Sequence, residues 1–345
     1  MKQRDTSLDI IRITACFMVV MMHSPLPSEN ANGAFLACLS YFTAPCIGLF
    51  FMVSGALLLP VKADYFTFIR KRFSKIIVPT LLWSLIYICL KIYNSDSEIN
   101  ILQTLVSIPL SAQGEGVLWF MYTLAGLYLL APIISAWIDK ATKREIELVL
   151  ILWVVTLCYP LFDFWLLTNK STTGILYYFT GYAGYFLLGL YLRRYSNSVS
   201  GLVCGGISFA GVVLFLVLKH YDIPFDFYQL FWYESLFIAA LGIAIYKAII
   251  NICKHIHINL LSKGGLVLST LSDVSFGIYL IHILVMRYWL WQQEWILSIS
   301  NYPLQCITIA IITMLVSVAV CLLIARLPKS EWLIGYRCKK KHAAI

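Results

Sequence analysis

Long apolar runs constrain the fold of this chain more than any other feature of its sequence. Runs of about 17 to 25 residues recur from end to end, which is the length that an α-helix needs to cross about 30 Å of hydrocarbon. A hydrophobic share of 60% with only 12% charged residues excludes an ordinary soluble globular protein. The short alternating strands that a membrane β-barrel requires are not seen. The chain is therefore predicted to be an all-α, polytopic integral membrane protein.

We expect about ten transmembrane helices within a single domain over residues 1–345, because no linker rich in Pro, Gly or Ser and no internal repeat divides the chain. Lys2 and Arg4 precede the first apolar run, as in a signal peptide, but no cleavage site of small residues follows, so we expect the run to be retained. The expected spans are residues 8–24, 34–60, 76–93, 117–138, 146–163, 174–192, 201–218, 228–246, 273–291 and 304–325.

Lys and Arg are unevenly divided between the two sides that these spans define. Of the 26 such residues, 21 lie in the N-terminal segment, in loops 61–75, 139–145, 193–200 and 247–272, and in the tail from Arg326. Three border the opposite side, namely Lys91, Lys170 and Lys219. Cytoplasmic loops carry an excess of Lys and Arg, so both termini are predicted to be cytoplasmic. The same distribution explains the net charge of +9 without a nucleic-acid partner.

Cysteine and glycine patterns both point to packing. The ten cysteines form no CxxC pair and lie mostly inside apolar runs, where Cys behaves as a small hydrophobe, so neither a disulfide framework nor a metal site is predicted. Two sets of glycines have spacings that let helices approach closely: Gly181, Gly184 and Gly189, and Gly201, Gly205 and Gly211.

Arg12 and His23 are the first candidates for chemistry, because they lie inside the first span. Eleven positions correspond to about three helical turns, or roughly 16 Å along the axis, so both side chains share nearly one face. Ionisable residues within a membrane usually face a bundle interior or a wet cavity. Purely structural roles also remain open for both residues. Arg12 either reaches the cytoplasmic surface or pairs with Asp9, and His23 is an interfacial histidine.

A basic cluster opens the third span in the stretch FIRKRFSKIIVP (68–79). It places Arg70, Lys71, Arg72 and Lys75 at the cytoplasmic mouth. Such a cluster either anchors a helix to anionic lipid or holds the phosphates of a ligand that enters from the cytoplasm.

Aromatic and histidine side chains in later spans are further candidates. Trp119 and Tyr122 lie where an interfacial aromatic belt is expected, and substrate stacking is the alternative. His282 and Arg287 lie inside the stretch SFGIYLIHILVMRYW (275–289). His282 is either a hydrogen-bonding residue of the bundle or a substrate-binding residue.

Together these motifs resemble the acyltransferase-3 family of bacterial membrane O-acyltransferases. The resemblance rests on Arg12 and His23 and on FFMVSGALLL (50–59), KRFSKIIVP (71–79), LWF (118–120) and YLIH (279–282), in that order, and it extends from Leu8 to LPKSEWLIG (327–335). Each motif alone is weak, whereas five in the correct order are specific for the family. The chain resembles the stand-alone, ten-span form.

The resemblance implies an enzyme of the bacterial cytoplasmic (inner) membrane that transfers an acyl group, most often acetyl from acetyl-CoA, to a hydroxyl of a surface or secreted carbohydrate. Arg12 and His23 match the family's essential Arg and His. The family's motif of two Arg followed after two residues by a third appears here as Lys71, Arg72 and Lys75, which keeps the charge but not the bidentate geometry. Acyl-CoA is expected as co-substrate, with no tightly bound cofactor, and a carbohydrate or lipid-linked glycan as acceptor.

Direct transfer is expected, with the donor phosphates on the basic cluster and the imidazole of His23 taking the proton of the acceptor hydroxyl. No serine or cysteine lies in a recognisable nucleophile motif. A transporter or flippase for polysaccharide or lipid-linked sugar is the alternative, since intramembrane Arg and His also mark transport pathways. An acyltransferase of the unrelated class with an Asn and His pair has no matching Asn here.

Overall fold

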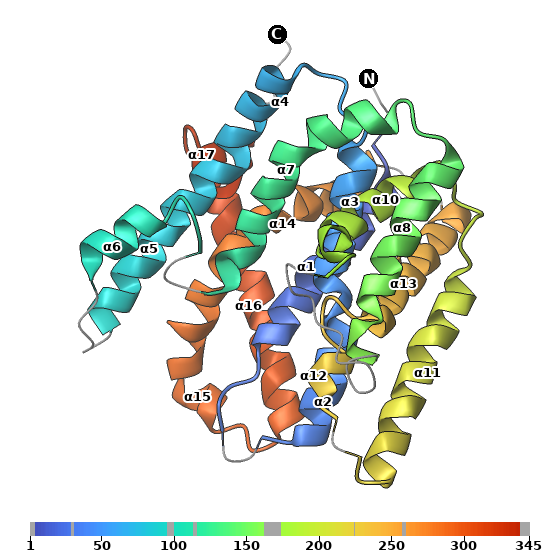
Figure 1. The fold of residues 1–345 in the computed structure, drawn as a ribbon. Helices are drawn as coiled ribbons and strands as arrows, with labels where there is room; N and C mark the ends of the chain where they lie inside the picture. Colours follow the sequence, from blue (N-terminus) through green and yellow to red (C-terminus); the bar gives the residue numbers. More distant parts are fainter. Residues whose placement is uncertain are drawn as a thin grey trace.

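The protein is a bundle of α-helices in the computed structural model (Figure 1). The structure describes residues 4–28, 31–94, 100–112, 116–161, 174–223, 225–256 and 260–338. No strand occurs within these ranges. The all-α, polytopic membrane fold expected from the sequence is therefore confirmed.

The longer helices are α1 (Thr6–His23), α2 (Gly33–Thr43), α3 (Pro45–Leu58), α4 (Tyr65–Arg72), α5 (Val78–Asn94), α7 (Trp119–Ile138), α8 (Lys143–Leu157), α10 (Ala183–Arg194), α11 (Gly201–His220), α13 (Leu236–His255), α14 (Lys263–Arg287) and α16 (Tyr302–Ile324). Shorter helices are α6 (Ile101–Ser107), α12 (Phe227–Leu230), α15 (Glu294–Leu297) and α17 (Glu331–Ile334). A π-helix, η1 (Phe73–Ile77), joins α4 to α5, and 3₁₀ turns occur at η2 (Gly116–Leu118), η3 (Tyr177–Phe179) and η4 (Leu290–Gln292).

Eight segments within the described ranges are long and apolar enough to cross a membrane. They are Thr6–His23, Gly33–Leu58, Tyr65–Asn94, Gly116–Ile138, Gly201–His220, Leu236–His255, Lys263–Gln292 and Tyr302–Ile324. The other two predicted spans, 146–163 and 174–192, overlap α8 and α10, which have 15 and 12 residues. At 1.5 Å per residue these helices are about 22 and 18 Å long, less than the thickness of the hydrocarbon core. Residues 162–173 lie outside the described ranges.

The limits of two helices differ from the predicted ones by several residues. A serine side chain at the N-cap explains where each helix begins. The span predicted at 228–246 is α13, whose first turn is capped by the side chain of Ser235, and the helix continues through Lys254. The span predicted at 273–291 is α14, which begins ten residues earlier because Ser262 caps it. Asp273 therefore lies within a helix rather than at its start.

The centre of the bundle is built on α1, α3 and α14, with α10 packed on α3 and α16 on α14. Two glycines allow α3 and α10 to touch through their backbones. A β-carbon at Gly55 would lie 1.7 Å from the carbonyl oxygen of Phe186, and one at Gly189 would lie 1.9 Å from that of Met52. Any larger side chain at either position forces the two helices apart.

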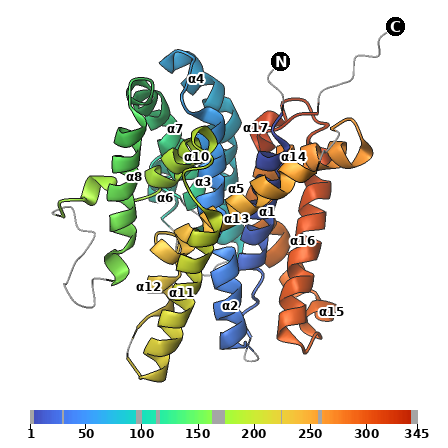
Figure 2. The same cartoon turned by 90° about the vertical axis from the view of Figure 1, so that its right-hand side faces the viewer.

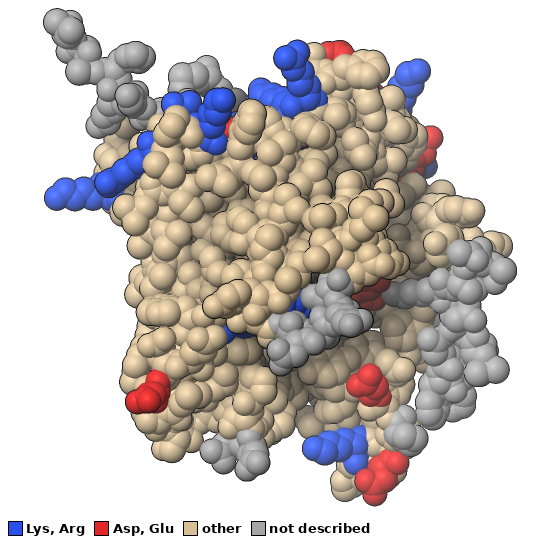
Figure 3. All heavy atoms as spheres, turned by 90° about the vertical axis from the view of Figure 1, so that its left-hand side faces the viewer, with Lys and Arg blue, Asp and Glu red and all other residues tan. Residues whose placement is uncertain are grey.

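The first turn of α1, helix α4 and helix α17 all lie at one end of the bundle, which we call the basic end (Figures 1 and 2). Lys and Arg side chains gather at the same end of the face shown in Figure 3. This arrangement matches the uneven division of charge in the sequence.

Candidate functional site

The basic cluster sits on an irregular helix whose geometry follows from Pro79. Proline has no N–H, so Pro79 cannot bond to the carbonyl of Lys75 four residues earlier, and its ring disturbs that turn. The chain instead forms the π-helix η1, in which the N–H of Val78 donates to the carbonyl of Phe73. Single π-turns of this kind occur frequently at functional sites. Here η1 carries Lys75 one turn beyond Arg72.

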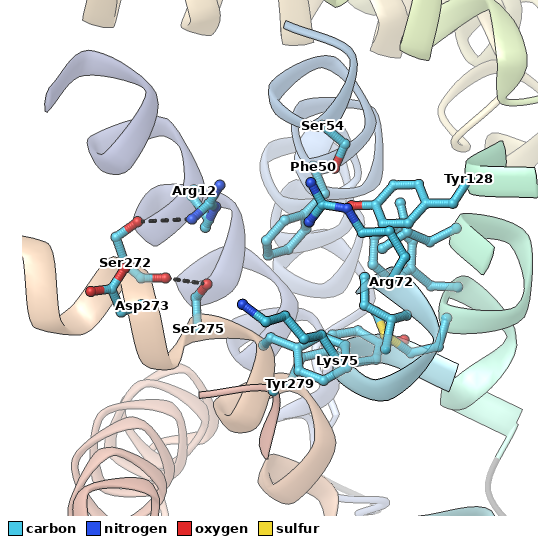
Figure 4. A pocket seen from close by; sticks show the side chains of 16 residues that line it. Arg12, Phe50, Ser54, Arg72, Lys75, Tyr128, Ser272, Asp273, Ser275 and Tyr279 are labelled. Carbon is cyan, nitrogen blue, oxygen red and sulfur yellow. Dashed lines mark hydrogen bonds between the residues drawn. The ribbon is translucent and has the colours of Figure 1, made fainter. Parts of the chain in front are cut away.

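A cavity of about 410 Å³ lies beside this turn, between α1, α3, α7 and α14 (Figure 4). We call it the cationic cavity. Its lining residues are Arg12, Phe50, Ser54, Arg72, Lys75, Ile76, Phe120, Met121, Leu124, Tyr128, Ser272, Asp273, Ser275, Phe276, Tyr279 and Gly335. Four of these carry charge, and three of the four are cations.

Arg72 and Lys75 extend toward Arg12 from the opposite side of the cavity (Figure 4). The guanidinium of Arg72 lies 5.4 Å from the ring centre of Phe68 and 5.6 Å from that of Tyr128, which fixes its plane by cation–π contact. Its Nε is buried and has no hydrogen-bond partner among the described residues. A donor held in this way is suited to an anionic ligand.

The four predicted cations of this cluster therefore divide into two pairs. Arg72 and Lys75 line the cavity. Arg70 and Lys71 are exposed and do not line it. Consecutive residues on a helix point about 100° apart, so only part of a run of cations can face one cavity.

Arg12 does not pair with Asp9, one of the structural interpretations that the sequence left open. Arg4 takes that carboxylate, with Nε 2.5 Å from Oδ2 and Nη2 3.1 Å from Oδ1. Arg4 also binds Asp273 on α14, through Nη2 and Oδ1 at 2.9 Å. The hydrogen bond to Asp9 raises the pKa of the Arg4 guanidinium above its ordinary value, so Arg4 stays charged and satisfies both carboxylates.

Ser272 connects this ion-pair network to Arg12. Its hydroxyl donates to Oδ1 of Asp9 at 2.6 Å and accepts from Nη1 of Arg12 at 3.2 Å. This is the hydrogen bond that the structure records for Arg12 within the described residues. The rest of the guanidinium remains available to the cavity, whose single acidic lining residue, Asp273, is already bound to Arg4. The cavity therefore has more cationic side chains than carboxylates to pair with them.

His23 lies at the far end of α1, where its ring is 5.3 Å from the ring of His282. Nδ1 of His23 is 2.8 Å from the carbonyl of Val19, and Nδ1 of His282 is 2.6 Å from the carbonyl of Tyr279. A carbonyl only accepts, so Nδ1 is the donor in both contacts, and in the neutral form of each imidazole Nε2 is then the acceptor. We call the two rings the histidine pair.

His282 is completely buried, and its Nε2 has no partner among the described residues. Buried polar atoms are normally hydrogen-bonded, so this nitrogen lacks a donor that a ligand hydroxyl can supply. The charge of Arg287, on the same helix as His282, acts electrostatically on both rings.

One layer of aromatic rings separates the cationic cavity from the histidine pair. Tyr279 lines the cavity, and its ring is 5.6 Å from that of His282 and 5.3 Å from that of Phe120. The hydroxyl of Tyr279 donates to the carbonyl of Val117. Arg12 therefore lines the cavity whereas His23, on the same helix, lies beyond it.

The other two predicted substrate-binding residues have different surroundings. Trp119 is in an aromatic cluster with Tyr182 at 5.3 Å and Tyr233 at 5.7 Å, and the Tyr233 hydroxyl is 3.0 Å from the sulfur of Met22, next to His23. Tyr122 instead donates to the carbonyl of Ile108 at 2.7 Å and lies 3.0 Å from Ser84, so its hydroxyl joins α7 to neighbouring segments.

Sequence reasoning missed Arg4, Ser272 and Asp273. In the sequence, Arg4 stands out only as a topological charge, and Asp273 falls at the edge of a predicted span. A carboxylate inside an apolar helix is itself a signal, because it requires a partner. The described residues contain no group of three His, Cys, Asp or Glu placed to hold a metal ion.

A helical membrane bundle with a cationic cavity and a neighbouring pair of histidines defines an integral membrane protein with a polar site inside its bundle. The chain belongs to the acyltransferase-3 family: the family model, described as an acyltransferase domain, matches residues 5–326. Membership supports membrane acyltransferase activity. No curated protein and no solved structure matches the chain.

Proposed function

We propose that this protein transfers an acyl group, acetyl in the first instance, from cytoplasmic acyl-CoA to a hydroxyl of a surface or secreted carbohydrate, and that it works in the bacterial cytoplasmic membrane. The observation that carries the proposal is the convergence of Arg12, Arg72 and Lys75 on one cavity at the basic end, one aromatic layer from His23 and His282.

The cationic cavity suits the phosphorylated end of the donor. Coenzyme A carries a diphosphate and a phosphate monoester, and guanidinium and ammonium groups bind phosphate oxygens through charge-assisted hydrogen bonds. Arg72 and Arg12 each have donors that no described residue uses. If the basic end faces the cytoplasm, as the charge distribution predicts, the cavity lies on the side where acyl-CoA is found.

The histidine pair suits the reacting end of the donor. Arg12 and His23 lie on one uninterrupted helix, eleven residues or about 16 Å apart along its axis. A phosphate group beside Arg12 thus leaves the extended arm of the donor to place its thioester near His23. The arm must pass the ring of Tyr279, so we expect this aromatic layer to open when the donor binds.

In the transfer step, Nε2 of His23 takes the proton of the acceptor hydroxyl while the oxygen attacks the thioester carbonyl carbon. A carbon–oxygen bond forms and the carbon–sulfur bond breaks. The proton then passes from His23 to the departing thiolate, which leaves as free coenzyme A. Nε2 of His282 accepts a hydrogen bond from a second hydroxyl of the acceptor and orients it.

The acceptor is expected to approach the histidine pair through the aromatic cluster of Trp119, Tyr182 and Tyr233. Apolar faces of sugar rings pack on aromatic rings, and this cluster reaches Met22 beside His23. Its position supports a carbohydrate acceptor and favours substrate stacking for Trp119, which was the alternative to an interfacial aromatic belt.

The test is thiol release from acetyl-CoA by the purified protein in lipid nanodiscs, followed by mass analysis of surface glycans from cells with and without the protein. We expect thiol release that depends on an added glycan and on His23, together with loss of acetyl groups from the glycan in cells that lack the protein. Glycan-dependent movement of sugar across the bilayer without thiol release would contradict the proposal and favour a transporter.

A further inference from the structure

A second cavity, of about 650 Å³, lies between the start of α11 and the end of α13. It shares no lining residue with the cationic cavity. The two helices lie side by side and run in opposite directions, which places the first turn of α11 beside Lys247 of α13 (Figure 1). We call this cavity the α11–α13 groove.

One wall of the groove is polar and basic. Lys247, Asn251 and Lys254 line it, and their spacing of four and three residues places them on one face of α13. No acidic residue is among the described residues that line the groove. The wall therefore presents two positive charges and an amide.

The opposite wall is made of small residues. Gly201 and Gly205 lie one turn apart on α11, facing α13: a β-carbon at Gly201 would lie 2.8 Å from the β-carbon of Lys247, and one at Gly205 would lie 3.9 Å from that of Ala244. This is the close helix approach that the glycine spacing predicts. At Gly205 the β-carbon of Ala244 is the one neighbouring atom within 4 Å, so there is room beside Gly205 for a slender apolar chain.

Lys247 is the residue whose surroundings indicate a ligand. Its residue is only 9% exposed, and its ammonium donates to the carbonyl of Ser196. An ammonium has three donors, and no carboxylate within ion-pair distance of Lys247 is recorded in the described parts of the chain. A buried cation without a counter-charge is costly, and an anion in the groove removes that cost.

The groove lies at the end of two membrane-spanning helices, where lipid headgroups are found. Leu202, which lines it, is 90% exposed, as is normal for a side chain that faces lipid. Basic pockets between membrane helices on the cytoplasmic side are typical sites for anionic lipid headgroups. We propose that the α11–α13 groove binds an anionic phospholipid, with its phosphate at Lys247 and Lys254 and an acyl chain beside Gly205.

Native mass spectrometry of the full-length protein in detergent tests this, with phosphatidylglycerol titrated against phosphatidylcholine. We expect one phosphatidylglycerol molecule to bind more tightly than the others. Lys254→Gln should weaken that binding about fivefold, as expected for loss of one basic residue at a headgroup. Gly205→Leu, which fills the groove without changing its charge, should weaken it as well. Lys140→Gln is the matched control, because Lys140 is also exposed at the basic end but does not line the groove.

Three results would overturn the proposal. The first is equal binding of both lipids, and the second is an equal loss of binding in the Lys140 control. The third is displacement of the lipid by millimolar glycerol phosphate with no dependence on residue 205, because the site would then take a soluble phosphate. None of these measurements uses acyl-CoA, so they do not depend on the enzymatic activity.

Discussion

The cationic cavity and the histidine pair lie on the same helix and have opposite character. The cavity holds three cations with donors to spare, and its one carboxylate is bound by Arg4. In the histidine pair, His282 is completely buried, and Nδ1 of each ring contacts a backbone carbonyl and not a charged side chain. One region has an excess of positive charge, which suits the proposed phosphate ligand, and the other has imidazole nitrogens, which suit the proposed proton transfer.

The difference shows how one helix serves both tasks. A guanidinium next to a catalytic imidazole would disfavour its protonation, because like charges repel strongly in a low-dielectric interior. Eleven residues of α1 and a layer of aromatic rings keep Arg12 away from His23, so that Arg287 is the arginine whose charge acts on both rings. The proposed substrate spans the gap, since its charges and its thioester lie at opposite ends.

The largest expected effect on the rate of transfer comes from a substitution in the histidine pair. His23→Ala removes the proposed base and should lower the rate constant for transfer by about 10² to 10⁴-fold. Binding of acyl-CoA, measured by isothermal titration calorimetry, should be unchanged because the cationic cavity is intact. His220→Ala, at an exposed site at the end of α11, is the control. Full activity of the His23 variant would move the base to another residue.

Breaking the anion-binding region should give a different kinetic signature. Arg72→Gln should raise the KM for acyl-CoA about tenfold to a hundredfold with little change in kcat, because a charge-assisted contact to phosphate is lost. Arg70→Gln serves as the matched control, since Arg70 is two residues away and exposed. A similar rise in KM for both variants would show that the cluster acts only through its overall charge.

The role of the second ring sharpens the comparison. His282→Asn keeps a donor for the carbonyl of Tyr279 and removes the unpartnered Nε2. We expect kcat to fall about tenfold, less than for His23, with an unchanged KM for acyl-CoA, because this nitrogen orients the acceptor and is not the base. A loss as large as that of His23→Ala would instead assign the proton to His282.

The smallest expected effect tests the link between the ion-pair network and the cavity. Ser272→Ala removes the hydroxyl that bridges Asp9 and Arg12, and the KM for acyl-CoA should rise about fivefold, as for one lost hydrogen bond. Ser269→Ala is the control, since Arg4 contacts only the backbone carbonyl at that position. An unchanged KM for the Ser272 variant would mean that Arg12 needs no support from α14.

Much of the site could be anticipated from residue chemistry. Arg12 and His23 were singled out because ionisable side chains are costly inside a membrane, and the structure places the first in the cavity and the second in the histidine pair. The separation of Arg72 and Lys75 from Arg70 and Lys71 was not predictable, because it depends on the π-turn that Pro79 introduces and on where α7 packs.

The sequence by itself determined the membrane-helical fold, the helices that carry the candidate residues and the uneven charge, because hydropathy and helical spacing are local properties. Only the tertiary structure decided which residues meet. The partner of Asp9 is Arg4 and not Arg12, and Ser272 and Asp273 reach this network from a helix more than 250 residues further along the chain. Contacts of this kind depend on how helices rotate and cross when packed, and the period of a single helix does not encode that.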